Sequence, residues 1–173
     1  HLSIRRQRQM CIRDSLSASA DEAQLVLSAF LIMLGLGQLV AGSMSDTLGR
    51  RPVLLAGSLL FTVAGAAALI SPNIELLIVA RALQGFGASA CMAVGRVIIN
   101  DSFDKTEAGR QLSTITMIMA IVPMLGFAGG GLVADIIGWR GTVGIMVITA
   151  GVIFLANMAL LAETNHNLSL IHI

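Results

Sequence analysis

The chain has 173 residues, of which 55% are apolar and 12% are charged, and its formal net charge is +1 at pH 7. An average soluble domain has about 25% charged residues, so this composition excludes a disordered chain and argues against a water-soluble domain. The basic residues are scattered, which excludes the basic footprint of a nucleic-acid-binding protein. Cys11 and Cys91 have no Cys or His at a metal-ligand spacing, so we expect neither a metal site nor a disulfide framework.

Apolar stretches long enough to cross a bilayer as helices follow one another along the chain. A membrane-spanning helix needs about 20 apolar residues, whereas a barrel strand would be about half as long and would alternate. The chain therefore predicts an all-α integral membrane protein whose surroundings are the lipid bilayer. The five predicted spans are 23–44, 53–70, 76–99, 112–134 and 142–162.

Basic residues in the connectors indicate the orientation. Arg50 and Arg51 lie in the first connector and Lys105 lies in the third, so the positive-inside rule places both connectors in the cytoplasm. This orientation puts the arginine-rich head of the chain on the outer side, which conflicts with the same rule. We therefore expect that a preceding helix is missing and that residues 1–17 are a non-native head. Residues 166–173 are interpreted as a non-native tail, because segments 10–15 and 168–173 resemble translated read-through of sequencing adapters.

The first connector carries the sharpest motif. It reads GSMSDTLGRRP from Gly42 to Pro52, with the spacing G-x-x-x-D-x-x-G-R-R. Gly42 permits close approach of two helices, Gly49 can adopt the positive φ that reverses the chain, and Asp46 is placed to pair with Arg50. In the alternative interpretation, the arginines are only positive-inside anchors and the aspartate is a helix-end partner.

Arg81 is the main candidate for function inside a span. It lies about five residues, or roughly 8 Å, inside the span 76–99. Placing an arginine at this depth in the bilayer costs free energy unless its side chain faces a partner or a water-filled cavity. Gln84 follows at i+3, and small residues continue the same face, which is typical of a helix that faces a bundle interior. The alternative is that Arg81 snorkels to the headgroups.

Further polar and small residues form helical stripes. On the first span, Gln38 shares a face with Gly35 and Gly42, for which close packing is the alternative to ligand contact. At the inner end of the third span, we expect Arg96 and Asp101 to cap or anchor the helix and to pair with the first connector. On the fourth span, the residues that could let the helix bend are Pro123, Gly126 and Gly130.

These motifs resemble those of a known family. The first connector resembles the signature of major facilitator superfamily transporters, between the second and third helices of a six-helix half. The stretch from Arg81 through Gln84 and Gly85 resembles the R-x-x-Q-G pattern of drug:proton antiporters. Residues 25–103 as a whole are similar to the bicyclomycin-resistance (Bcr/CflA) group. The resemblance covers 18–165 and implies helices two to six of a partial N-terminal half, without helix one and the second half.

The resemblance also implies a function. It implies a multi-pass transporter of the bacterial inner membrane that exports drugs or small organic compounds in exchange for protons, by alternating access. Its partners would be the substrate, protons and the missing second half. The implied gating motif is Gly42, Asp46, Gly49, Arg50 and Arg51, and the implied proton-coupling or substrate-path residues are Arg81, Gln84, Gly85 and Gln38. No acidic residue lies in the middle of a span, so we expect the titrating carboxylate in the missing helix one.

Other functions stay open on the sequence. A uniporter or symporter of sugars or metabolites would keep the first-connector motif but lack R-x-x-Q-G, and a non-transporting membrane scaffold would lack polar groups inside its spans. The chain has no phosphate-binding loop and no nucleophile or acid-base set at membrane depth, so we expect neither an enzyme nor a cofactor.

Overall fold

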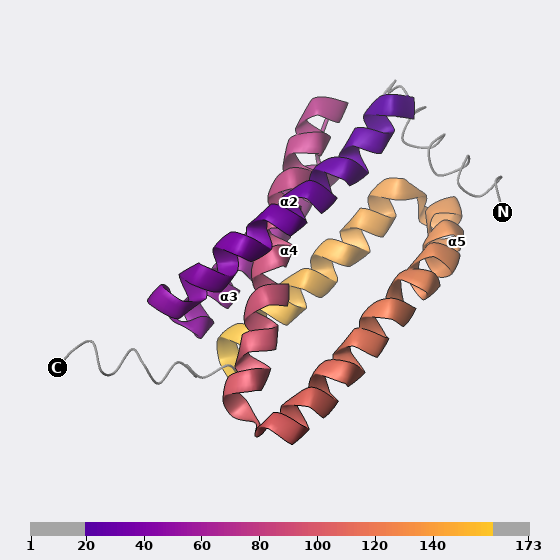
Figure 1. The fold of residues 1–173 in the computed structure, drawn as a ribbon. Coiled ribbons are helices and arrows are strands. Elements are labelled where there is room, and N and C mark those ends of the chain that lie inside the picture. The colour runs from indigo at the N-terminus through magenta and orange to yellow at the C-terminus, as the bar shows by residue number, and fades with distance from the viewer. Residues whose placement is uncertain (1–19, 161–173) are drawn as a thin grey trace.

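The computed structural model describes residues 20–160, and the regular elements in this part are α-helices (Figure 1). Both predicted non-native ends lie outside the described residues. The helices are α2 (Ala20–Leu48), α3 (Arg50–Leu69), α4 (Ile74–Ser102) and α5 (Lys105–Leu160). Gly138 interrupts α5 with a φ of 74°, so α5 consists of two antiparallel arms, residues 105–137 and 139–160.

The described residues contain five segments long and apolar enough to cross a membrane. This confirms the predicted class, an all-helical membrane protein with five spans. The reversal between the last two spans falls at Gly138, inside the predicted connector, because glycine adopts a positive φ without strain.

Two connectors are shorter than predicted. Gly49 alone separates α2 from α3, and only Phe103 and Asp104 separate α4 from α5. The prediction of a connector over 100–111 is therefore wrong at both ends, where the chain is helical. A local cap accounts for the early start of α5, since a carboxylate oxygen of Asp104 accepts the backbone N–H of Glu107 at 3.0 Å.

α4 is the central helix of the group formed by α2, α3 and α4, and it packs mainly against α2 and α3. At Gly85, a Cβ would overlap the carbonyl oxygen of Phe30 on α2. At Gly87, a Cβ would lie 2.6 Å from the backbone nitrogen of Phe61 on α3. Small residues thus bring the three backbones into contact, which is how membrane helices commonly associate.

Two apolar clusters fill the interior of the described chain. The first lies near the α3–α4 turn and includes one residue from the second arm of α5, whereas the second lies near the α2–α3 turn. The first consists of Ala68, Ile74, Leu77, Ala80 and Val143, and the second of Ala41, Val53, Leu54, Ala90 and Val94.

The surface of the helices is largely apolar. Leu39 on α2 is 78% exposed, and Ile136 on the first arm of α5 is 81% exposed. The first arm is exposed along most of its length and stands apart from α2 in Figure 1. An apolar surface of this extent is expected where lipid, rather than water, surrounds the helices.

Candidate functional site

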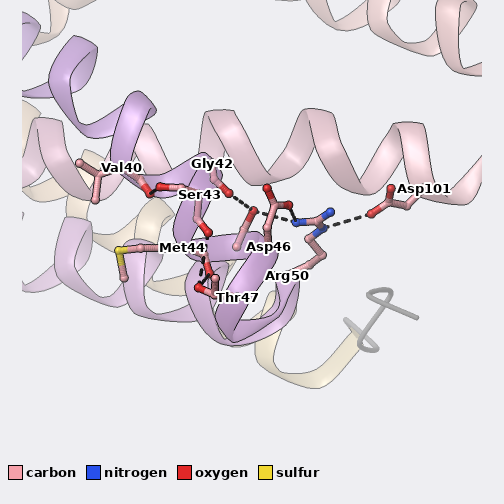
Figure 2. Close-up of polar contacts among 9 residues, drawn as sticks. Val40, Gly42, Ser43, Met44, Asp46, Thr47, Arg50 and Asp101 are labelled. Carbon is pink, nitrogen blue, oxygen red and sulfur yellow. Dashed lines mark hydrogen bonds and ion pairs between the residues drawn. The ribbon is translucent and has the colours of Figure 1, made fainter. Parts of the chain in front are cut away.

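Arg50 joins three helices at the end of the bundle where α2 meets α3 (Figure 2). From the first turn of α3, its Nη1 donates to Ser45 Oγ at 3.0 Å and to the carboxylate of Asp46, both on α2. Its Nε donates to Asp101 Oδ2 on α4 at 3.1 Å. We call Ser45, Asp46, Arg50 and Asp101 the Arg50 cluster. The predicted pairing of Asp46 with Arg50 is confirmed, and so is the predicted pairing of Asp101 with the first connector.

The one-residue connection explains this geometry. Gly49 has a φ of 100°, a left-handed conformation that favours glycine, so α3 starts directly after α2 ends. Arg50 therefore lies close to the last turn of α2, which carries Asp46. The side chain of Arg50 is only 11% exposed, whereas that of Asp46 is 66% exposed. In this cluster, the carboxylate of Asp46 therefore lies at the surface, whereas the guanidinium of Arg50 is largely buried.

The other residues predicted near this end have separate neighbours. Arg51 Nη2 donates to the carbonyl oxygen of Met158 at 3.2 Å, which connects α3 to the second arm of α5. Arg96 is exposed on α4 and forms no hydrogen bond or ion pair within residues 20–160, so its predicted pairing with the first connector is not formed there. The predicted role of Gly42 in close helix packing is wrong for the described chain, because a Cβ there would meet no atom within 4 Å.

The close approach on α2 occurs instead at Gly37. A Cβ at Gly37 would overlap the side chain of Ser89 and lie 2.9 Å from Phe86 on α4. Gly35, in the predicted stripe, has open space around it. The stripe of Gly35 and Gly42 therefore does not pack within the described residues. Both faces of α2 carry small and apolar residues, so hydropathy alone does not indicate which face packs.

Arg81 and Gln84 interact one turn apart on α4. Arg81 Nη1 donates to Gln84 Oε1 at 3.1 Å. Arg81 is half-buried, and its Nε is buried with no hydrogen-bond partner in the part of the chain that the structure describes. Gln84 is fully buried. The guanidinium therefore has one neutral side-chain partner and spare donors inside the membrane-spanning region.

Gln84 is enclosed by neighbours that the sequence did not indicate. Its Nε2 lies 4.0 Å from the sulfur of Met146 on the second arm of α5. A Cβ at Gly65 on α3 would lie 2.8 Å from the same nitrogen. Neither residue stands out in the sequence, because Gly and Met are both frequent in these spans. Gly85 packs against α2 through Phe30, so its role visible in the structure is close packing.

Gln38 lies far from Arg81 along the helices. α2 and α4 run in the same direction, with Phe30 beside Gly85 and Gly37 beside Ser89. These pairs place Gln38 about ten residues, or about 15 Å, further along the helix pair than Arg81. The described residues therefore do not place Gln38 beside Arg81, and its role in a substrate path stays a prediction.

The backbone of α5 is helical through Pro123, Gly126 and Gly130. Its non-helical residue is Gly138, at the reversal between the arms. A bending role for the three residues stays a prediction. Among residues 20–160, no group of three or more His, Cys, Asp or Glu side chains could hold a metal ion.

Comparisons with known proteins agree with this architecture. The profile of the Major Facilitator Superfamily matches residues 9–171. The chain is 42% identical over 120 residues to an uncharacterized MFS-type transporter, YdgK, of Bacillus subtilis (strain 168), which covers 69% of this chain and 30% of the relative.

Two further relatives carry names that refer to drugs. A chloramphenicol resistance protein of Pseudomonas aeruginosa is 38% identical over 132 residues, covering 73% of this chain and 30% of the relative. Multidrug resistance protein D of Escherichia coli (strain K12) is 32% identical over 140 residues, covering 80% of this chain and 36% of the relative. The chain thus spans about a third of the length of these curated relatives. Their similarity, the family match and the helical membrane fold together show that the chain belongs to the major facilitator superfamily.

Proposed function

We propose that the whole transporter containing this segment exports drugs or similar small organic compounds across the bacterial inner membrane in exchange for protons. The observation that carries the proposal is Arg81, a half-buried cation inside a span that has one neutral side-chain partner among residues 20–160. Relatives named for chloramphenicol resistance and multidrug resistance support the substrate class. The resemblance of residues 25–103 to the Bcr/CflA group is part of the same proposal.

Arg81 is suited to bind a carboxylate that changes its protonation state. A cation nearby favours the ionised form of an acid, and protonation of that acid would release the guanidinium. The acidic residues among residues 20–160 lie in loops or near helix ends. We therefore place the proton-carrying acid in the remainder of the transporter, with Arg81 as the group that sets its proton affinity.

The Arg50 cluster has a different role in the proposed mechanism. Alternating access requires each half to move largely as a rigid body around a central site. Arg50 holds the ends of α2, α3 and α4 together. Asp46 lies at the surface of this end, where the second half of a transporter could reach it. We propose that contacts to this cluster form and break as the two halves rock.

The proposal can be tested in the full-length transporter that carries this segment. Purified protein in weakly buffered detergent solution would receive chloramphenicol, and a pH-sensitive dye would record proton release. We expect release from the unaltered protein, loss of release in Arg81→Ala, and normal release in the control Arg96→Ala. Arg96 is matched in residue type and helix but is exposed.

Flux measurements then separate the classes of transporter. In proteoliposomes, an imposed proton gradient should drive chloramphenicol in the direction opposite to the protons. Chloramphenicol flux that does not depend on the proton gradient would indicate a uniporter. Flux in the same direction as the protons would indicate a symporter. Either result would overturn the proposed antiport mechanism, and intact proton release in Arg81→Ala would overturn the proposed role of Arg81 in it.

A further inference from the structure

We infer that Gly65 of α3 and Met146 of α5 are positioning residues for Arg81, and that they act through the side-chain amide of Gln84. The inference rests on the proposed function for its meaning in transport, although its geometry stands without it. Gly65, Gln84 and Met146 come from three different helices. The three elements meet at this amide, which is fully buried.

The amide of Gln84 has two ends with different contacts. Its oxygen accepts a hydrogen bond from Arg81 Nη1 at 3.1 Å, and its nitrogen lies 4.0 Å from the sulfur of Met146. The amide group is planar, so holding the nitrogen against Met146 aims the oxygen at Arg81. The thioether is a weak acceptor, and it favours this orientation over the flipped one, which would turn two donors toward the guanidinium.

Gly65 leaves the space that the amide occupies. A Cβ at this position would lie 2.8 Å from Gln84 Nε2 and 2.9 Å from Val147 Cγ2. Both obstructing atoms are the ends of side chains rather than backbone atoms. We therefore expect Gly65→Ala to preserve the helices and to displace the amide. The alanine also favours helix formation relative to glycine.

Displacing the amide should release Arg81. Within the described residues, Gln84 is the side chain that accepts a hydrogen bond from Arg81, and Arg81 Nε has no partner. The direction of the guanidinium therefore depends on where Gln84 Oε1 lies. Through Gly65 and Met146, a shift of α3 or of the second arm of α5 against α4 would change that direction.

The test observes the Arg81 side chain directly. The full chain, labelled with ¹⁵N-arginine in detergent micelles, gives an Nε–H NMR resonance for Arg81 that is assigned by its loss in Arg81→Lys. In Gly65→Ala we expect this resonance to move, and we expect hydrogen exchange with water at Nη1, the nitrogen that donates to Gln84, to accelerate about fivefold, as expected for loss of one hydrogen bond. Gly144→Ala is the matched control, because its Cβ would meet Leu69 only at 4.0 Å.

A double-substitution cycle separates positioning from a general packing defect. In a Gln84→Ala background Arg81 has already lost the amide, so Gly65→Ala should cause no further acceleration of exchange. Met146→Leu keeps a similar volume without the sulfur, and we expect it to accelerate exchange less than Gly65→Ala does. An unchanged Arg81 resonance in Gly65→Ala, or a full additional effect in the Gln84→Ala background, would overturn the inference.

A transport measurement distinguishes this inference from the proposed function. In the full-length transporter, Gly65→Ala should shift the pH dependence of drug export, and Gly144→Ala should leave it unchanged. If the Arg81 resonance responds but the pH profile does not, the positioning role stands and the proposed role of Arg81 in proton coupling fails. If the resonance does not respond, the positioning role fails whatever the transport assay shows.

Discussion

Arg50 and Arg81 are both arginines with little exposure at membrane-spanning helices, but their surroundings differ. Arg50 has two carboxylates and a hydroxyl as partners, on α2 and α4. Arg81 has one neutral amide, and its Nε is buried without a partner in the described residues. A paired cation at a helix end can stabilise the fold, whereas a buried cation without a counterion lowers stability. This difference supports the proposals that Arg50 holds the helix ends together and that Arg81 takes part in transport.

Replacing Arg50 should have the largest effect on stability. Arg50→Met removes hydrogen bonds that join three helix ends and leaves Asp101 without this partner, so we expect the free energy of unfolding to fall by about 2 kcal/mol. Denaturant unfolding of the chain in detergent micelles, followed by circular dichroism, measures this change. The control Arg96→Met should be neutral, and a neutral Arg50→Met would remove the structural role of the Arg50 cluster.

Replacing Arg81 should change stability in the opposite direction. Arg81→Met removes a buried charge but leaves Gln84 Oε1 without this donor, and we expect a net rise of about 1 kcal/mol in the free energy of unfolding. The same unfolding assay measures it. A clear loss of stability in Arg81→Met would show that Arg81 is a structural residue like Arg50, and the contrast between the two sites would disappear.

Removing one carboxylate of the Arg50 cluster should have a smaller effect. Asp101→Asn keeps the size of the side chain and leaves Asp46 and Ser45 in place, so we expect a loss of about 0.5 to 1 kcal/mol. A cycle with Arg50→Met isolates the pair, and the effect of Asp101→Asn should vanish in that background. An equal effect in both backgrounds would mean that Asp101 acts on helix α4 alone.

Salt should produce the smallest effect and should distinguish the two sites. Raising NaCl to about 1 M shortens the Debye length to about 3 Å. The side chain of Asp46 is largely exposed, so the destabilisation caused by Arg50→Met should shrink by a few tenths of a kcal/mol. The change caused by Arg81→Met should stay constant. Equal salt dependence would indicate that solvent reaches Arg81 as readily as Arg50.

Local spacing was enough to predict several features of the chain. The lengths of the apolar stretches predicted five spans, and Gly49 and Asp46 predicted the turn and the ion pair with Arg50. These features depend on residues that are close in sequence, where helical geometry determines which groups meet. The ends of the spans were less certain, as the cap at Asp104 shows, because a single carboxylate can start a helix inside a polar stretch.

Contacts between helices could not be derived in the same way. Asp101 reaches Arg50 across a separation of 51 residues, α2 packs through Gly37 rather than Gly35, and Gln84 is enclosed by Gly65 and Met146. In a membrane protein, both the packed and the lipid-facing sides of a helix are apolar, so hydropathy does not distinguish them. The sequence therefore determined which segments are helices and where they turn. Which helix faces pack together is visible only in the tertiary structure, because it depends on the combined shapes of several helices.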